Sequence, residues 1–271
     1  MRWNKLAAVT VCAFCVVGFA VAQEEDVMAP GGHEVRNISS PVFIQDAVPQ
    51  PRGTMDFRLK WNYETGAEGT DDDFGLELEW AWGTCQNAEL WLSLPINLGD
   101  GGWDPDEVGG NADLSFGLLY RFWEEADWLP AFAMSGELRM PTGYHSSGVE
   151  AEFRGMLTKT LVGDLRGHLN AFALTVNSDN HPDARDFQWG FLFGVDCPLT
   201  AAKDLWLIVD YMHRSSEHYG ASNMNMLEAG LEWEFTEGQS LHFSTQVGLD
   251  DNEDTPNWGA KMAYTYEIRV Y

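Results

Sequence analysis

Apolar and polar residues alternate along about 12 separate stretches of this chain, each roughly 10 residues long. The first stretch has an apolar side chain at every second position from Met55 to Tyr63, and charged residues such as Arg58 and Lys60 stand between them. Successive side chains of a β-strand point to opposite faces. The alternation therefore predicts strands with one apolar face and one charged face.

The same pattern places the strands along most of the chain, with ends uncertain by about 2–4 residues. The predicted strands are 54–64, 73–83, 87–96, 111–123, 130–141, 150–161, 165–177, 186–197, 203–213, 226–236, 239–249 and 257–271.

The polar faces of these strands carry full charges. A packed, dry core would not tolerate them, since an unpaired buried charge is costly. The charged face is expected to contact water, and the other face lipid or a second sheet. The candidates for lining a water-filled interior are Arg58, Lys60, Glu77, Glu79, Arg121, Glu137, Arg139, Glu152, Arg154, Arg166, His168, Glu228, Glu232 and Lys261.

The connections between strands decide in favour of lipid. After odd-numbered strands they are long and often acidic, as in Asn97–Gly110, and after even-numbered strands they are mostly tight, as in Val162–Asp164. Outer-membrane barrels have this division between outside loops and periplasmic turns. Aromatic residues also gather near both predicted rims, where such barrels meet the membrane interfaces. The fold class predicted is all-β: a transmembrane up-and-down antiparallel β-barrel of about 12 strands.

Three segments follow from this interpretation. Residues 1–22 have the basic start, apolar stretch and Ala20-Val21-Ala22 cleavage site of a signal peptide. Residues 23–53 show no strand period and predict a flexible periplasmic segment, or alternatively a plug that enters the lumen. Residues 54–271 form the barrel, whose first and last strands must pair because an open edge is not tolerated in lipid.

The net charge limits the kinds of partner that the protein can bind. Removing the leader with Arg2 and Lys5 changes the formal net charge from −26 to −28, and such a surface repels nucleic acid. Lipid and lipopolysaccharide of the outer membrane are the expected surroundings. The acidic runs Asp71–Asp73 and Asp250–Asp254 lack the spacing of an EF-hand calcium loop. No metal site and no cofactor is predicted.

Cysteine placement argues against a disulfide. Cys85 and Cys197 remain after cleavage of the leader, and an exported protein can form a bridge. They fall on opposite walls of the predicted barrel, however, beyond the ~7 Å reach of a disulfide. Both are expected to be free thiols.

Two segments resemble a known family. The first is Gly110-Asn-Ala-Asp-Leu-Ser-Phe-Gly-Leu-Leu-Tyr-Arg-Phe122, and the second is Glu137-Leu-Arg-Met-Pro-Thr-Gly143. They are similar to the Gly/Asp turn and the Pro-Thr-Gly strand exit of the MetA-pathway of phenol degradation family of outer-membrane proteins. The resemblance implies passage of small aromatic or other hydrophobic molecules, no catalytic residues, and a strand-terminating role for Pro141–Gly143. The aromatic-ended C-terminus is similar to the signal read by the barrel assembly machinery.

Two alternatives to transport remain open. The mixed charges could pair and fill a narrow barrel, which would make the protein a structural or adhesive one. An outer-membrane esterase or phospholipase is the rival enzyme class, because His145-Ser146-Ser147 and His213-Arg214-Ser215 both have a His-x-Ser spacing. Lys159 occupies the position at which an asparagine partner for the first pair would be expected. We therefore predict a passive channel for a small-molecule solute, without enzymatic activity.

Overall fold

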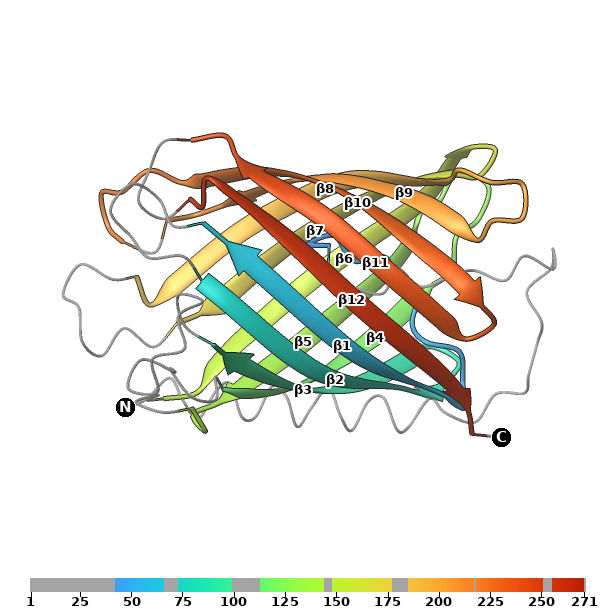
Figure 1. Ribbon diagram of the computed structural model, residues 1–271, viewed down its shortest axis with the longest axis horizontal. Coiled ribbons are helices and arrows are strands. Elements are labelled where there is room, and N and C mark those ends of the chain that lie inside the picture. Colours follow the sequence, from blue (N-terminus) through green and yellow to red (C-terminus); the bar gives the residue numbers. More distant parts are fainter. Residues whose placement is uncertain are drawn as a thin grey trace.

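The strands close into one barrel. In this computed structural model the described residues are 42–65, 73–98, 113–143, 148–176, 185–216, 218–250 and 255–270. Within them, twelve antiparallel strands follow one another around the ring in chain order (Figure 1). The strands are β1 (Thr54–Glu64), β2 (Asp73–Cys85), β3 (Ala88–Asn97), β4 (Leu114–Trp123), β5 (Ala131–Met140), β6 (Glu150–Val162), β7 (Leu165–Thr175), β8 (Phe187–Pro198), β9 (Leu205–Arg214), β10 (Met224–Thr236), β11 (Gln239–Gly248) and β12 (Trp258–Arg269).

The fold class and each predicted strand are confirmed. The largest difference at a strand end is the start of β4, which lies at Leu114 rather than at residue 111. β5 ends at Met140, directly before Pro141, whose missing N–H cannot continue a ladder. The next residue, Thr142, accepts a hydrogen bond from the Leu114 N–H at 2.9 Å and so joins the outer ends of β4 and β5.

The pairing of β1 with β12 closes the ring. Its register runs from Thr54 opposite Arg269 to Glu64 opposite Gly259, along the full length of β1. Because β1 also pairs with β2 along nearly all of its length, both edges of the first strand are covered. A barrel has no free sheet edge, and this is the condition for placing strands in hydrocarbon.

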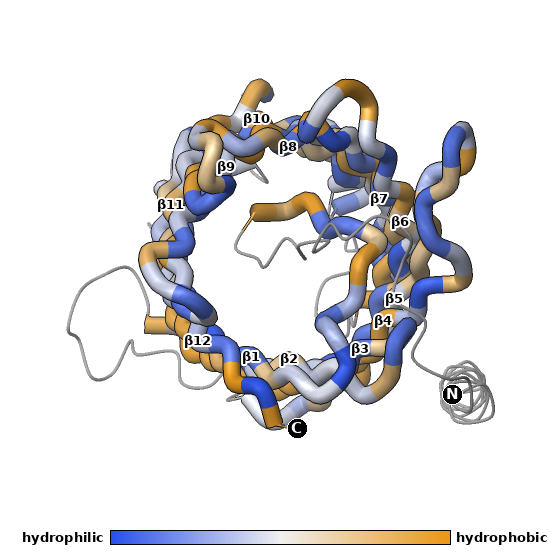
Figure 2. The backbone as a smooth tube through the Cα atoms, turned by 90° about the vertical axis from the view of Figure 1, so that its right-hand side faces the viewer, coloured by the Kyte–Doolittle hydropathy of each residue, from blue (hydrophilic) through white to orange (hydrophobic). Residues whose placement is uncertain are grey.

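Side chains alternate between the two faces of the wall. Along β8 the exposed residues Phe187, Phe191 and Val195 alternate with the buried residues Gln188 and Asp196. Seen end-on, the strands form a ring around an interior (Figure 2). The residues predicted to face lipid are on the exposed outer surface of the ring, and the polar residues point inward.

Tight turns and irregularities gather at one end of the barrel. The pairs β2–β3, β4–β5, β6–β7 and β10–β11 each have a register shift directly beside their connecting turn. Gly163 and Gly238 adopt positive φ angles of 58° and 72° in two of these turns, a conformation that favours glycine. The long connections predicted at the opposite end fall largely outside the described residues.

Aromatic rings mark both ends of the outer surface. Phe187 and Trp189 are exposed near the end with long loops, and Trp80, Trp233 and Phe235 near the end with tight turns. Rings in these positions suit the two membrane interfaces. In the part of the chain that the structure describes, no helix has the length and hydropathy needed to cross a membrane. Cys85 and Cys197 are free thiols, as expected.

A charged side chain on the outer surface should lower the stability of the barrel most at the middle of a strand. Leu231 lies in the middle of β10 and Phe235 near its end, and both are exposed on the outer surface. We expect Leu231→Arg to lower the free energy of unfolding in phospholipid vesicles by about 2–4 kcal/mol, and Phe235→Arg by about 0–1 kcal/mol. Denaturant titration measures both values, and equal losses would contradict the assigned membrane depth.

Candidate functional site

The inner wall carries its charges as clusters of ion pairs. At β1 and β2, Arg58 donates to Glu79 at 2.7 Å and to Asp56 at 2.9 Å, and Lys60 donates to Glu79 at 2.6 Å and to Glu77 at 3.0 Å. These groups are mostly buried. Removing one partner would leave an uncompensated buried charge, so the cluster fixes the side chains against the wall.

A second cluster lies on β5 and β6. Arg139 pairs with Glu137 at 3.0 Å and lies 3.6 Å from Glu152. Arg154 pairs with the same Glu152 at 2.8 Å. Arg139 also lies 3.7 Å from Glu150, so three carboxylates surround Arg139.

The remaining predicted residues are distributed around the ring. Arg166 on β7 pairs with Asp196 on β8, and His168 lies beside the same carboxylate at 3.5 Å. On the facing wall, Lys261 on β12 pairs with Glu228 on β10 at 3.3 Å. Glu232 is buried on the same face of β10, four residues after Glu228.

Arg121 sits apart, near the end with tight turns. It donates to Asn87 at 2.9 Å and to Glu124 at 2.6 Å. Its guanidinium also interacts electrostatically with Asp46.

Residues 42–50, here called the lumen segment, occupy the bore. Figure 2 shows this stretch of chain inside the ring of strands. Val42, Ile44 and Asp46 are almost completely buried, although they belong to none of the strands. Residues 42–50 are the part of the segment 23–53 that the structure describes, and there the chain lies against the inner wall. Residues 23–41 lie outside the described part of the chain.

Polar contacts hold the lumen segment to the inner wall. The Gln50 N–H donates to Glu89 on β3 at 2.9 Å, and the Ala47 N–H to Thr158 on β6 at 2.9 Å. Asn170 on β7 makes two bonds with the Gln45 backbone, accepting from its N–H at 2.9 Å and donating to its carbonyl at 2.7 Å.

Contacts to charged side chains complete this attachment. Asp46 pairs with Arg166 at 3.3 Å, and the Phe43 N–H donates to Glu228 at 3.2 Å. Arg154 donates to the Phe43 carbonyl at 3.0 Å. Three of the predicted lumen-lining residues thus bind a segment of their own chain.

A tight bend guides the chain from β1 into the bore. The Gly53 N–H donates to the Gly83 carbonyl at 2.9 Å, and Gly53 adopts a positive φ of 78°. A Cβ at Gly83 would lie 2.0 Å from the Pro51 carbonyl oxygen, so only glycine leaves room for the passing backbone. The bend fixes one end of the lumen segment to the end of the barrel with tight turns.

The inner wall also has two apolar patches that the sequence analysis missed. The larger one, called the inner apolar patch, consists of Phe172, Leu192, Ile208, Met212, Met224 and Met226, on β7 to β10. Val42 and Ile44 pack against it. The smaller patch consists of Leu119, Ala131, Ala133 and Met156, on β4 to β6, and Ala47 packs against it. An available signal was the apolar residue at an inward-facing position, such as Met226 between Met224 and Glu228.

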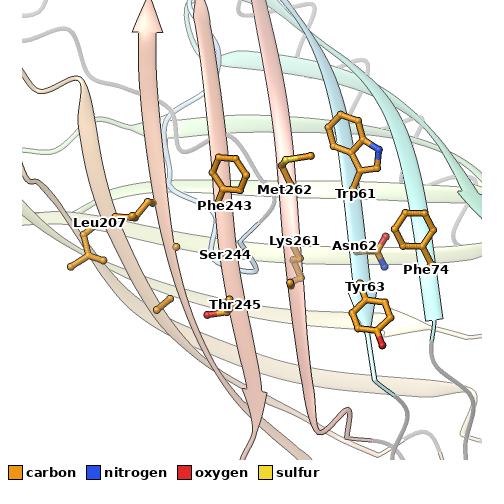
Figure 3. Close-up of a pocket in the computed structure, with 14 residues that line it drawn as sticks. Trp61, Asn62, Tyr63, Phe74, Leu207, Phe243, Ser244, Thr245, Lys261 and Met262 are labelled. Atoms are coloured by element: carbon orange, nitrogen blue, oxygen red, sulfur yellow. The ribbon is translucent and has the colours of Figure 1, made fainter. Parts of the chain in front are cut away.

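The wall of the barrel has a hollow where small residues of three strands meet. The small residues Ala229, Thr245 and Ala260 are neighbours across β10, β11 and β12. The larger Phe243 and Met262 stand beside them (Figure 3). The hollow has a volume of about 580 Å³. Asn62, Ser244 and Lys261, which have the inward-facing parity, also line it.

The candidate enzyme residues have other partners. His213 contacts Asn225 at 2.7 Å and stacks on Phe191, and the Ser215 hydroxyl accepts from the Trp189 N–H at 3.0 Å. Lys159 binds Glu125 at 2.8 Å. His145, Ser146 and Ser147 lie outside the described residues. Among the described residues, no group of three or more His, Cys, Asp or Glu side chains could hold a metal ion.

Comparison with known proteins relates the fold to outer-membrane barrels. No family model and no curated protein sequence matches the chain, so the MetA-pathway resemblance stays a prediction. The fold is similar to the crystal structure of the COG4313 outer membrane channel from Pseudomonas putida F1, with a TM-score of 0.65 and 13% identity over 84% of this chain and 100% of that one. It is also similar to the NanC porin, with a TM-score of 0.57 and 10% identity over 79% of this chain and 100% of that one. At these identities the likeness concerns the fold.

The bonds from Asn170 should hold the lumen segment in place. Asn170→Ala removes both of its bonds to Gln45, each contributing about 0.5–1.5 kcal/mol. We expect amide exchange of residues 43–47 to become about tenfold faster, as measured by hydrogen–deuterium exchange on the folded barrel. Asn225→Ala is the matched control, because Asn225 bonds Tyr211 and Asp250 on the other side of the wall. Equal exchange in the two variants would show that Asn170 does not hold the segment.

Proposed function

We propose that this protein is a passive outer-membrane channel for small hydrophobic or aromatic compounds, exported through a cleaved signal peptide. The observation that carries the proposal is the inner wall of the closed barrel, where buried charges and an apolar patch line one bore. The similarity of the fold to the COG4313 channel and the NanC porin also supports a channel function.

In this conformation the lumen segment closes the channel. It crosses the interior from Glu89 on β3 to Glu228 on β10. Twelve strands enclose a narrower space than the roughly 16–18 strands of open porins, so one extended segment obstructs much of it. Passage of a solute therefore requires the segment to move.

A whole-cell assay tests transport. Cells with and without the gene are exposed to a neutral aromatic dye that fluoresces in apolar surroundings, and to a labelled hexose of similar size. We expect loss of the gene to slow dye entry several-fold and to leave hexose entry unchanged. Unchanged entry of both solutes would favour the structural or adhesive alternative. Loss of hexose entry alone would assign the channel to polar solutes.

Locking the lumen segment should close the channel. The Ala47 N–H donates to the Thr158 hydroxyl at 2.9 Å, so this pair of neighbouring positions is chosen for two cysteines. In a chain with Cys85→Ser and Cys197→Ser, we expect Ala47→Cys/Thr158→Cys to lower single-channel conductance at least fivefold under oxidation. Reduction should restore it.

The single variant Ala47→Cys controls for the substitution itself, and its conductance should not respond to the oxidant. If the oxidised double variant conducts as well as the reduced one, the segment does not need to leave the wall. A chain that lacks residues 42–50 provides the open reference.

A further inference from the structure

The inner apolar patch is an unusual surface for the interior of a charged barrel. Its six side chains are each at most 9% exposed, and neighbouring strands bring them together: Leu192 is opposite Met212, and Met212 is opposite Met226. The residues that cover them belong to the lumen segment. If the segment leaves, an apolar surface built by four strands is uncovered in the bore.

The segment places an aromatic ring beside this patch. Phe43 is packed against the cluster, and the Lys261 ammonium lies 3.2 Å from the centroid of its ring. A cation over a ring face is attracted by the ring quadrupole. On the other side of the cluster, the Arg154 guanidinium lies 5.2 Å from the Phe172 ring. This part of the bore thus offers cations and apolar walls that suit an aromatic ring.

The methionines make the patch adaptable. Met212, Met224 and Met226 contribute half of its six side chains. Unbranched thioether chains fit ligands of different shape and make favourable contacts with aromatic rings. The same property would allow the patch to exchange Ile44 for another apolar group.

One buried carboxylate lies within this patch. Asp210 projects inward between Ile208 and Met212 on β9 and is 2% exposed. Neither of its oxygens meets the geometric limits of a hydrogen bond among the described residues, although the Ile44 backbone N–H lies close enough to interact with the carboxylate. A buried polar group without a partner is costly. A ligand with a donor group would satisfy it.

We propose that the inner apolar patch and Asp210 form a binding site for a small aromatic molecule that carries a hydroxyl or amine donor. The aromatic body packs on the methionines, and the donor binds the Asp210 carboxylate. Val42–Ile44 occupy the same surface, so the ligand and the lumen segment compete for it. This inference deepens the proposed function and rests on it, since it names the solute class and the place where the solute displaces the segment.

Methionine methyl resonances report on the site in the unmodified protein. The full mature chain, labelled with ¹³C at the methionine methyl groups, is titrated in micelles with benzyl alcohol. We expect saturable shifts at Met212, Met224 and Met226. Met156, which belongs to the smaller patch on β4 to β6 and packs against Ala47, is the internal control and should not shift. Shifts of equal size at all methyl groups without saturation would indicate partition into detergent and overturn the proposal.

The role of Asp210 is separated by two substitutions. Wild type should bind benzyl alcohol about fivefold to tenfold more tightly than toluene, which lacks the donor. Asp210→Leu should abolish this preference, and Asp210→Asn, which keeps an acceptor oxygen, should retain most of it. Equal affinities for the two compounds in wild type would remove Asp210 from the site.

Competition is measured by hydrogen–deuterium exchange. At saturating benzyl alcohol, the amides of residues 43–45 should exchange faster, and glycerol at the same concentration should have no effect. Unchanged or slower exchange would overturn the competition. If the methyl groups do not respond while dye entry still depends on the gene, the site is wrong and the channel function stands. If they respond and dye entry does not depend on the gene, the channel function is wrong.

Discussion

The pairing of every backbone N–H and C=O in the wall is the constraint from which the rest of the structure follows. In hydrocarbon an unpaired peptide group costs several kcal/mol, so β12 returns to β1 and the ring closes. Within the regularly paired part of each strand, alternate side chains lie on opposite surfaces of the closed wall. The outer set must then be apolar, and the inner set is free to carry charge. In this chain the inner side chains form ion pairs and bind the lumen segment.

The inner charges act mainly on one another and on the lumen segment. Arg166 illustrates both roles, because it pairs with Asp196 of the wall and with Asp46 of the segment. Glu228 likewise receives the Lys261 ammonium, the Ser244 hydroxyl and the Phe43 N–H. These networks hold long side chains against the wall and define the shape of the remaining space. Removing the segment would leave several of these groups to water, which is a tolerable loss in a bore but not in a dry core.

Much of this architecture was predictable from the sequence, because a two-residue period repeated in every strand states which face each residue takes. The inward placement of Arg58, Glu79 or Lys261 required only that parity. The lumen segment was beyond such reasoning, since Val42, Ile44 and Ala47 have no period and their partners lie on strands far away in the chain. The inner apolar patch was hidden for a related reason. Met212 and Leu192 follow the inward parity, but their contiguity depends on the register between β8 and β9, which a single sequence does not reveal.

The bend at Pro51–Gly53 has a consequence for concentration. Since the lumen segment is covalently continuous with β1, it never diffuses away from its seat, and a short tether of this kind gives an effective local concentration on the order of mM. A free molecule that binds to the same surface must compete with the tethered lumen segment. A compound at low concentration or with low affinity would not displace the segment, whereas a compound at high concentration would. The tether would thus set a threshold of supply below which the barrel remains a barrier.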